Sequence, residues 1–375
     1  MRIVIAPDKF KGSLSAGEVA EALKIGFHTV FKDSEYDLIP IADGGEGTSE
    51  TFRIALGGKE VACGSIDALG RPIDTAYVWV ADRKIAIIDM SAASGLWHIP
   101  PDERNPMKVS TYGTGLMIYD AISRGAEKIF VGLGGSATND GGCGMAAALG
   151  WEFLDEAGDI LEPTPEGLEK LHSIHPPTKS APVEFVGLAD VKNPLLGSRG
   201  ASAVYGPQKG ADAEMVPRLD AILKNVADCF VTMGGADKRE VPGSGAAGGL
   251  GFGILAFLGG NVEPGFEAIA DLVKLDEKIA AADLVLTGEG KLDSQTLEGK
   301  GPAGVAALAR RHKKPVIAFG GAVADEIALA SLFTACFAIA NRPLTLEESE
   351  KEAFMLLELA AARVARVLKC GTIHE

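Results

Sequence analysis

Four glycine-rich loops carry the side chains of this sequence that are best suited to chemistry. Each loop follows a short apolar run, and each combines glycine with a carboxylate, an amine or a hydroxyl group. Glycine lets the backbone approach a ligand closely, so that N–H groups can point at phosphate oxygens. Phosphoryl transfer needs such support together with a positioned acceptor. The four loops span residues 7–13, 42–48, 132–142 and 287–294.

The third loop contains Gly-Gly-Ser-Ala-Thr-Asn and is expected to hold the phosphates of a nucleotide, although a tight turn would use the same residues. A second glycine motif, at 243–248, matches the spacing of a dinucleotide-binding fingerprint but follows Pro242 rather than a strand. We therefore interpret it as a helix start near the nucleotide. The expected nucleotide-binding residues are Gly134, Gly135, Ser136, Thr138, Asn139, Ser244 and Gly245.

Carboxylates in and near these loops are candidate ligands for Mg²⁺, which prefers oxygen donors. We favour Asp43 and Asp190, with Glu289 as a further metal candidate, and Asp140 and Asp293 carry the same chemistry. Each of these acids could instead form a turn or cap the next helix. The metal prediction therefore depends on which of them the fold brings together.

Proton transfer and charge stabilisation need further groups. We expect Asp293 to orient or deprotonate the acceptor hydroxyl, and Lys9, with Lys291 as second choice, to stabilise charge on the transferring group. Asp43 and Asp190 complete the expected catalytic set through the metal. A solvated surface lysine is the structural alternative for either amine.

Several common enzyme signatures are absent. The sequence has no P-loop motif, no protein-kinase signature set and no Gly-x-Ser-x-Gly elbow. His172 and His175 lie in a proline-flanked segment without cysteine partners, so a zinc site is not expected there. These absences exclude the simplest hydrolase and P-loop interpretations.

Composition limits the class of protein and its partners. The chain has 375 residues, a net charge of −15 and no basic stripe, which argues against nucleic-acid binding. Its five cysteines are widely spaced, so a reducing, cytoplasmic location is expected. The uncharged stretch 241–262 is rich in glycine and reads as a buried helix rather than a membrane span.

The elements around the loops predict an α/β fold. Short buried strands alternate with amphipathic helices, which favours a parallel sheet covered on both faces. Ser15 and Glu18 have the spacing of a capping box at the start of one such helix. If the four strands that precede the loops share one sheet, the loops converge on one cleft.

Two segments interrupt that pattern and predict a second, mixed α/β domain inserted into the first. Residues 58–105 read as a meander of hairpins, and residues 151–190 contain a short hairpin, proline-rich connections and another strand. The predicted domains comprise residues 1–57, 106–150 and 268–375 for the parallel-sheet domain, and residues 58–105 and 151–267 for the inserted domain.

The loop motifs resemble those of the bacterial two-domain glycerate kinase family. Besides the four loops, Tyr-Gly-Pro-Gln-Lys-Gly at 205–210 and Pro-Gly-Ser-Gly-Ala-Ala-Gly-Gly-Leu-Gly at 242–251 are similar to it, and together the motifs cover essentially the whole chain. The resemblance implies a flavodoxin-like domain, a second domain of restriction-endonuclease-like type, and Mg²⁺-dependent transfer of the ATP γ-phosphate to D-glycerate. It favours 2-phosphoglycerate over 3-phosphoglycerate.

Two other functions remain open from the residues. A kinase of another small hydroxy acid or polyol would keep the phosphate loops and differ in its substrate pocket. A non-catalytic, metabolite-binding regulator is disfavoured by the carboxylate-rich loops. Neither a membrane nor a nucleic-acid partner is expected, and a homodimer is left open.

Overall fold

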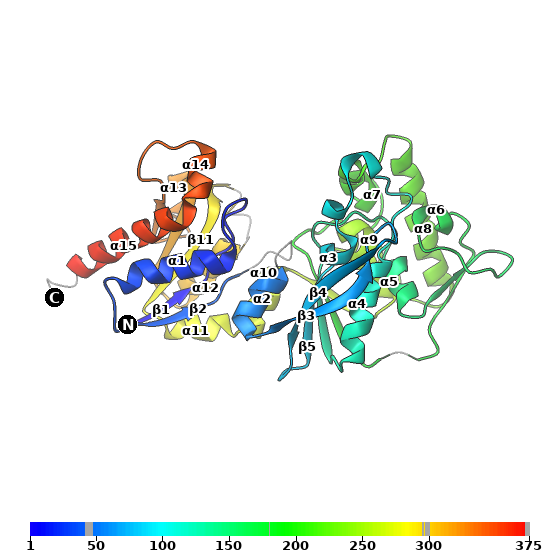
Figure 1. Cartoon of the computed structure of the whole chain (residues 1–375), viewed down its shortest axis with the longest axis horizontal. Helices are drawn as coiled ribbons and strands as arrows, with labels where there is room; N and C mark the ends of the chain where they lie inside the picture. The colour runs from blue at the N-terminus through cyan, green and yellow to red at the C-terminus, as the bar shows by residue number, and fades with distance from the viewer. Residues whose placement is uncertain (42–47, 180, 295, 297–300, 372–375) are drawn as a thin grey trace. The chain divides into compact units, whose positions relative to one another are not determined.

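The computed structural model describes residues 1–41, 48–179, 181–294, 296 and 301–371, and its chain divides into two compact units. The first unit comprises residues 1–43, 54–57 and 266–375, and the second comprises residues 44–53 and 58–265. Both are mixed α/β structures with largely parallel sheets, as the sequence predicts. Each unit is described by itself below (Figure 1).

The first unit contains a five-stranded parallel sheet with strand order β13-β12-β11-β1-β2. When the five strands are renumbered in chain order and the sheet is read from β2 to β13, the order is 2-1-3-4-5. The strands are β1 (Arg2–Ile5), β2 (Glu35–Leu38), β11 (Leu284–Leu292), β12 (Val316–Val323) and β13 (Ala335–Ala338). The helices are α1 (Ala16–His28), α10 (Gly265–Leu272), α11 (Leu275–Ala281), α12 (Gly301–Arg311), α13 (Glu326–Leu329), α14 (Leu346–Lys351) and α15 (Ala353–Gly371).

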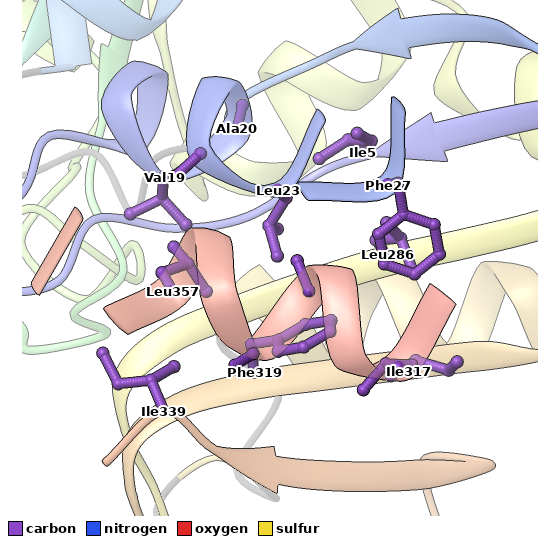
Figure 2. Packing of buried hydrophobic residues seen from close by; sticks show 14 of the residues in the cluster. Ile5, Val19, Ala20, Leu23, Phe27, Leu286, Ile317, Phe319, Ile339 and Leu357 are labelled. Atoms are coloured by element: carbon purple, nitrogen blue, oxygen red, sulfur yellow. The ribbon is translucent and has the colours of Figure 1, made fainter. Parts of the chain in front are cut away.

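Helices α1 and α15 lie side by side over one face of this sheet, where they close an apolar core (Figures 1 and 2). Leu23 and Phe27 of α1 and Leu357 of α15 pack against Leu286 and Phe319 of the central strands. Alternate residues such as Val4 and Val285 are also fully buried, so both faces of the sheet are covered. Helix α11 contacts β1, and helix α12 contacts β11 and β12.

Local signals predicted the helix starts well. The Ser15 hydroxyl accepts the Glu18 N–H, and the Glu18 carboxylate accepts the Ser15 N–H at 2.8 Å, which confirms the capping box. Thr345 and Glu348 form a second capping box at the start of α14. The pattern over 345–368 predicts one helix, but the structure breaks it at Glu352, between α14 and α15.

The second unit contains a six-stranded sheet with order β10-β9-β6-β5-β4-β3, in which β4 runs antiparallel to both of its neighbours and the other pairs are parallel. The strands are β3 (Lys59–Ile66), β4 (Pro72–Val80), β5 (Ile85–Asp89), β6 (Lys128–Gly132), β9 (Glu184–Leu188) and β10 (Asn261–Glu263), with β7 (Glu152–Leu154) and β8 (Ser173–His175) forming a separate hairpin. The predicted meander of residues 58–105 is confirmed by β3, β4 and β5.

Helices surround this sheet, and α2 contributes residues to both units. They are α2 (Thr48–Leu56), α3 (Ser91–Ser94), α4 (Tyr112–Ser123), α5 (Cys143–Ala148), α6 (Pro165–Leu168), α7 (Ala201–Tyr205), α8 (Met215–Thr232) and α9 (Ala246–Ala256), with 3₁₀ turns η1 (Leu96–His98), η2 (Pro101–Glu103) and η3 (Pro207–Lys209). Helix α9 is buried along its whole length. In the described part of the chain, no helix is long and apolar enough to cross a bilayer.

One part of the domain prediction is wrong. Residues 106–150 were expected in the parallel-sheet domain with β1, but β6 pairs with β5 and β9 in the sheet of the second unit. Residues 44–53 also belong to the second unit. A short buried strand reads the same in either sheet, because its pattern records burial and not its neighbours. The four glycine-rich loops therefore do not all leave one sheet.

Candidate functional site

A single row of residues marks the carboxyl ends of the parallel strands in the second unit. Asp89, Gly132, Leu188 and Glu263 are successive register partners across β5, β6, β9 and β10. Because parallel strands end at one edge, the segments that leave this row lie along the same edge of the sheet, where open α/β sheets bind ligands. They include the 134–142 loop and Asp190.

Asp140 organises the 134–142 loop from inside. Its fully buried carboxylate accepts the N–H and the hydroxyl of Thr111, both at 2.8 Å, and the N–H groups of Gly142 and Gly144 at 3.2 and 3.1 Å. Burial raises the pKa of this carboxyl, and the hydrogen bonds from Thr111, Gly144 and Gly142 oppose the rise. With its oxygens holding the loop and α5, Asp140 is a structural residue rather than a ligand of Mg²⁺.

The predicted phosphate-binding residues present donors and acceptors along this loop. Gly135 adopts a positive φ of 69°, and the N–H groups of Gly134, Gly135 and Thr138 have no acceptor among the described residues. The Thr138 hydroxyl and the side-chain amide oxygen Oδ1 of Asn139 are buried without a hydrogen-bond partner in the described part of the chain. Buried polar groups normally find partners, so these atoms indicate a polar ligand.

Lys209, in the turn η3, lies beneath this loop with only 2% of its surface exposed. Its Nζ donates to the Ser136 hydroxyl and to the Thr138 carbonyl, both at 2.7 Å. Burial lowers the pKa of the ammonium to about 7, and the charge of Asp140 partly offsets this fall. The site therefore contains a buried cation among neutral partners.

The 242–251 segment packs directly against the same loop. Gly248 has a φ of 68°, and a Cβ there would lie 1.8 Å from the Thr138 carbonyl oxygen. The Gly248 carbonyl accepts the Gly141 N–H. Ser244 is fully buried and donates its hydroxyl to the Arg239 carbonyl, and a Cβ on Gly245 would collide with the Pro194 carbonyl. Ser244 and Gly245 thus pack within the fold against Arg239 and Pro194, and Gly248 makes the contact with the loop.

Two further carboxylates stand at this edge. Asp190 is exposed just past β9 and accepts the Gly265 N–H at 3.1 Å. Asp89, which the sequence reasoning missed, ends β5 and accepts the N–H and the hydroxyl of Ser49 at 3.2 and 2.7 Å, which caps the start of α2. Residues 42–47, which include the candidate Asp43, lie outside the described residues.

The first unit has its own group of predicted residues at the carboxyl edge of its sheet. Lys9 follows β1, where the N–H of Asp8 donates to Gly288 of β11. Glu289 accepts the Thr296 hydroxyl at 2.6 Å, and Lys291 forms an ion pair with Asp293 at 2.8 Å. The hydrogen bond and charge of Asp293 raise the pKa of the Lys291 ammonium. Thr296 thus links Glu289 and Asp293, and Lys9 follows the neighbouring strand β1 at the same edge of the sheet.

A cavity of about 380 Å³ opens beside this group. Lys11 and Lys291 contribute amines, Ser13 and Ser349 contribute hydroxyls, and the wall is otherwise mainly apolar. The remaining lining residues are Phe10, Gly290, Gly321, Ala322, Ile339, Ala340, Leu344, Thr345, Leu346, Glu350 and Ala353. This combination of cations and apolar surface suits a small anionic ligand or part of a nucleotide.

The predicted site residues are therefore divided between the units. Lys9, Glu289, Lys291 and Asp293 belong to the first unit, whereas Asp190, the 134–139 loop, Ser244 and Gly245 belong to the second. Among the described residues, no three His, Cys, Asp or Glu side chains gather as a metal cluster.

Sequence reasoning missed roles for Lys209 and Asp89. A lysine in Gly-Pro-Gln-Lys-Gly reads as an exposed turn, and nothing local shows that it is buried. Asp89 had a usable signal, because it ends a buried strand in the same way as the residues that were chosen.

Comparisons with known proteins agree with one another along the whole chain. The model of the glycerate kinase family matches residues 3–369. A glycerate kinase of Bacillus cereus is 42% identical over 99% of both chains, and the glycerate 2-kinase of Escherichia coli K12 is 39% identical over 99% of both. A solved crystal structure from Salmonella typhimurium LT2, provisionally named glycerate kinase 2, matches with a TM-score of 0.89 and 42% identity over 99% of both chains. This chain belongs to the glycerate kinase family, whose members are phosphotransferases.

Proposed function

We propose that this protein transfers the γ-phosphate of ATP to the 2-hydroxyl of D-glycerate, giving 2-phosphoglycerate and ADP. The observation that carries the proposal is the 134–139 loop, which lies against the buried Lys209 and whose N–H groups and buried side-chain oxygens lack partners in the described part of the chain. Oriented N–H groups and a fixed cation are what phosphoryl groups require. The full-length match to glycerate kinases supports glycerate as the substrate that accepts the phosphate.

The name of the Escherichia coli relative favours the 2-hydroxyl. A kinase of another hydroxy acid or polyol remains the second candidate, because the phosphate loop alone does not select the acceptor.

The first unit supports the nucleotide reaction through its topology and its charges. The strand order 2-1-3-4-5 is that of flavodoxin-like sheets, whose ligands bind at the carboxyl edge of the strands. Lys9 and Lys291 are proposed to stabilise charge on the transferring group. Asp293 is proposed to orient or deprotonate the glycerate hydroxyl, and its ion pair with Lys291 holds the carboxylate at this edge of the sheet.

We propose a Mg²⁺ requirement on the chemistry of the available donors. Asp190 offers an exposed carboxylate at the strand edge beside the phosphate loop, and Glu289 and Asp43 are the other candidates. Mg²⁺ is commonly bound by one or two carboxylates plus substrate phosphates, so a dedicated cluster is not needed. When bound, Mg²⁺ would neutralise phosphate charge. The cysteines of the described chain are free thiols, which fits a cytoplasmic enzyme.

The test is a coupled assay of the purified protein with ATP, Mg²⁺ and D-glycerate. We expect glycerate-dependent ADP release, and a product that enolase alone consumes. A requirement for phosphoglycerate mutase before enolase would place the phosphate on the 3-hydroxyl instead. Folded protein that releases ADP only with a different hydroxy acid would replace the proposed acceptor by the second candidate.

A further inference from the structure

Lys209 is a buried lysine without a carboxylate partner in the described part of the chain. Its ammonium group is buried, and its hydrogen-bond partners are a hydroxyl and a carbonyl, neither of which carries charge. No carboxylate forms an ion pair with it in the described part of the chain. Removing an ammonium from water is costly unless a counter-charge compensates. A buried lysine with neutral partners is therefore unusual in a structural position.

Asp140 does not supply the missing counter-charge through a direct pair. Its charge acts on Lys209, but its oxygens accept four hydrogen bonds from Thr111, Gly142 and Gly144. Asp140 is the charged group that acts on Lys209, and the two groups that hold the ammonium do not titrate. Among the described residues, no negatively charged group therefore contacts the Lys209 ammonium, and both groups that do contact it belong to the 134–139 loop.

The 134–139 loop, which contacts Lys209, has hydrogen-bond donors without acceptors in the described part of the chain. The two atoms that accept from Nζ belong to Ser136 and Thr138, in the same stretch whose N–H groups lack acceptors. The buried Thr138 hydroxyl also lacks a partner in the described part of the chain. An anion that accepts hydrogen bonds from these donors would satisfy them, and Ser136 and Thr138 would connect it to the Lys209 ammonium.

We propose that Lys209 is the positioning charge of an anion subsite on the 134–139 loop, and that it takes up a proton when a phosphate or carboxylate group binds there. This inference rests on the proposed function and adds a mechanism to it. Lys209 does not contact the reacting atoms. It acts through Ser136 and Thr138, whose positions it holds, and through its charge.

The protonation state of Lys209 makes this assignment testable. With a pKa of about 7, roughly nine-tenths of the Lys209 side chains are neutral in the free protein at pH 8. An anion favours the charged form, so binding at pH 8 should draw in up to about 0.9 proton. At pH 6 the side chain is already protonated, and uptake should be close to zero.

Calorimetry measures this uptake directly. We would titrate the full-length protein with D-glycerate and, separately, with inorganic tripolyphosphate, at pH 6 and pH 8, each in two buffers that differ in ionisation enthalpy. The two ligands separate a carboxylate subsite from a phosphate subsite. We expect one of them to bind with close to one proton taken up at pH 8, and affinity to fall by up to roughly 50-fold between pH 7 and pH 9.

Two variants separate a charge role from a purely structural one. Lys209→Met keeps the volume and removes the charge, so the part of the proton uptake and of the pH dependence that Lys209 causes should disappear. The loss of a charge-assisted interaction should weaken binding about 10- to 100-fold at pH 7. Lys170→Met, at an exposed lysine of the same unit, is the matched control and should retain the wild-type uptake.

The outcomes distinguish this inference from the proposed function. Proton uptake that is absent in the wild type, or unchanged in Lys209→Met, would overturn the inference while leaving the kinase assay untouched. If Lys209→Met does not fold, the wild-type comparison between pH 6 and pH 8 decides by itself. If tripolyphosphate binds with proton uptake but the protein does not phosphorylate D-glycerate, the anion subsite is supported. D-Glycerate is then wrong as the proposed acceptor. No binding of either ligand would overturn the subsite.

Discussion

The ammonium of Lys209 donates to the hydroxyl of Ser136 at 2.7 Å, although the two residues are 73 positions apart in the chain. The contact joins the turn η3 to the loop that follows β6. It places a buried amine against a segment in which the N–H groups of Gly134, Gly135 and Thr138 have no acceptor among the described residues. Stability, pH dependence and anion binding should therefore be coupled at this one contact.

The first prediction concerns stability and pH. The folded-state pKa of Lys209, about 7, is below the ordinary lysine value of 10.5, so the unfolded chain binds more protons between these two values. The contribution of Lys209 to the free energy of unfolding should therefore rise as the pH increases from 7 to about 10, and be lowest below pH 7. Urea unfolding of the wild type and Lys209→Met across this range measures it. A difference between the two that does not change with pH would contradict the prediction.

The second prediction concerns the acceptor inside the loop. Asp140→Asn replaces one carboxylate oxygen by an amide nitrogen, which cannot accept the buried N–H groups that Asp140 now holds. We expect a loss of about 3 kcal/mol of unfolding free energy, together with a fall in kcat because the loop loses its shape. Chemical denaturation and the coupled assay measure both effects. Asp212→Asn is the control, because its exposed Oδ1 holds two N–H groups and remains an acceptor in asparagine.

The third prediction compares two glycines with nearly the same backbone conformation. Gly248 and Gly259 have φ values of 68° and 64°, but a Cβ on Gly259 would meet nothing within 4 Å, whereas one on Gly248 would meet the Thr138 carbonyl. Gly259→Ala should cost about 1–2 kcal/mol from its backbone alone. Gly248→Ala should cost about 4 kcal/mol or more and displace the loop. Thermal unfolding and the KM for ATP test this, and equal losses for both variants would argue against close packing at Gly248.

The fourth prediction concerns the metal. If Asp190 binds Mg²⁺, Asp190→Asn should raise the Mg²⁺ concentration for half-maximal activity by about 10- to 100-fold, with little change in stability because the side chain is exposed. A magnesium titration of the coupled assay measures the shift. Asp155→Asn makes the same charge change in an exposed hairpin of the same unit and should leave the titration unaltered. An unaltered titration in Asp190→Asn would remove Asp190 from the metal site.

Local signals in the sequence determined much of this protein. The capping box of Ser15 and Glu18, the meander of β3 to β5 and the glycine-rich loops all follow from residues that are close together in the chain. Such patterns are local because helix caps, strand alternation and turns depend on neighbouring residues. The motifs also sufficed to indicate the family, which the comparisons then confirmed.

Only the tertiary structure decided which strands share a sheet and which side chains are buried together. The strand Lys128–Gly132 joined the second unit because its partners are β5 and β9, a choice that its own apolar pattern does not encode. Tertiary structure also decided the surroundings of Asp140 and Lys209. The Asp140 carboxylate is buried and accepts the N–H of Thr111, and the turn residue Lys209 is buried and donates to Ser136. Burial and charge pairing depend on segments that are distant in sequence, so the chemistry of these two residues is set by the fold.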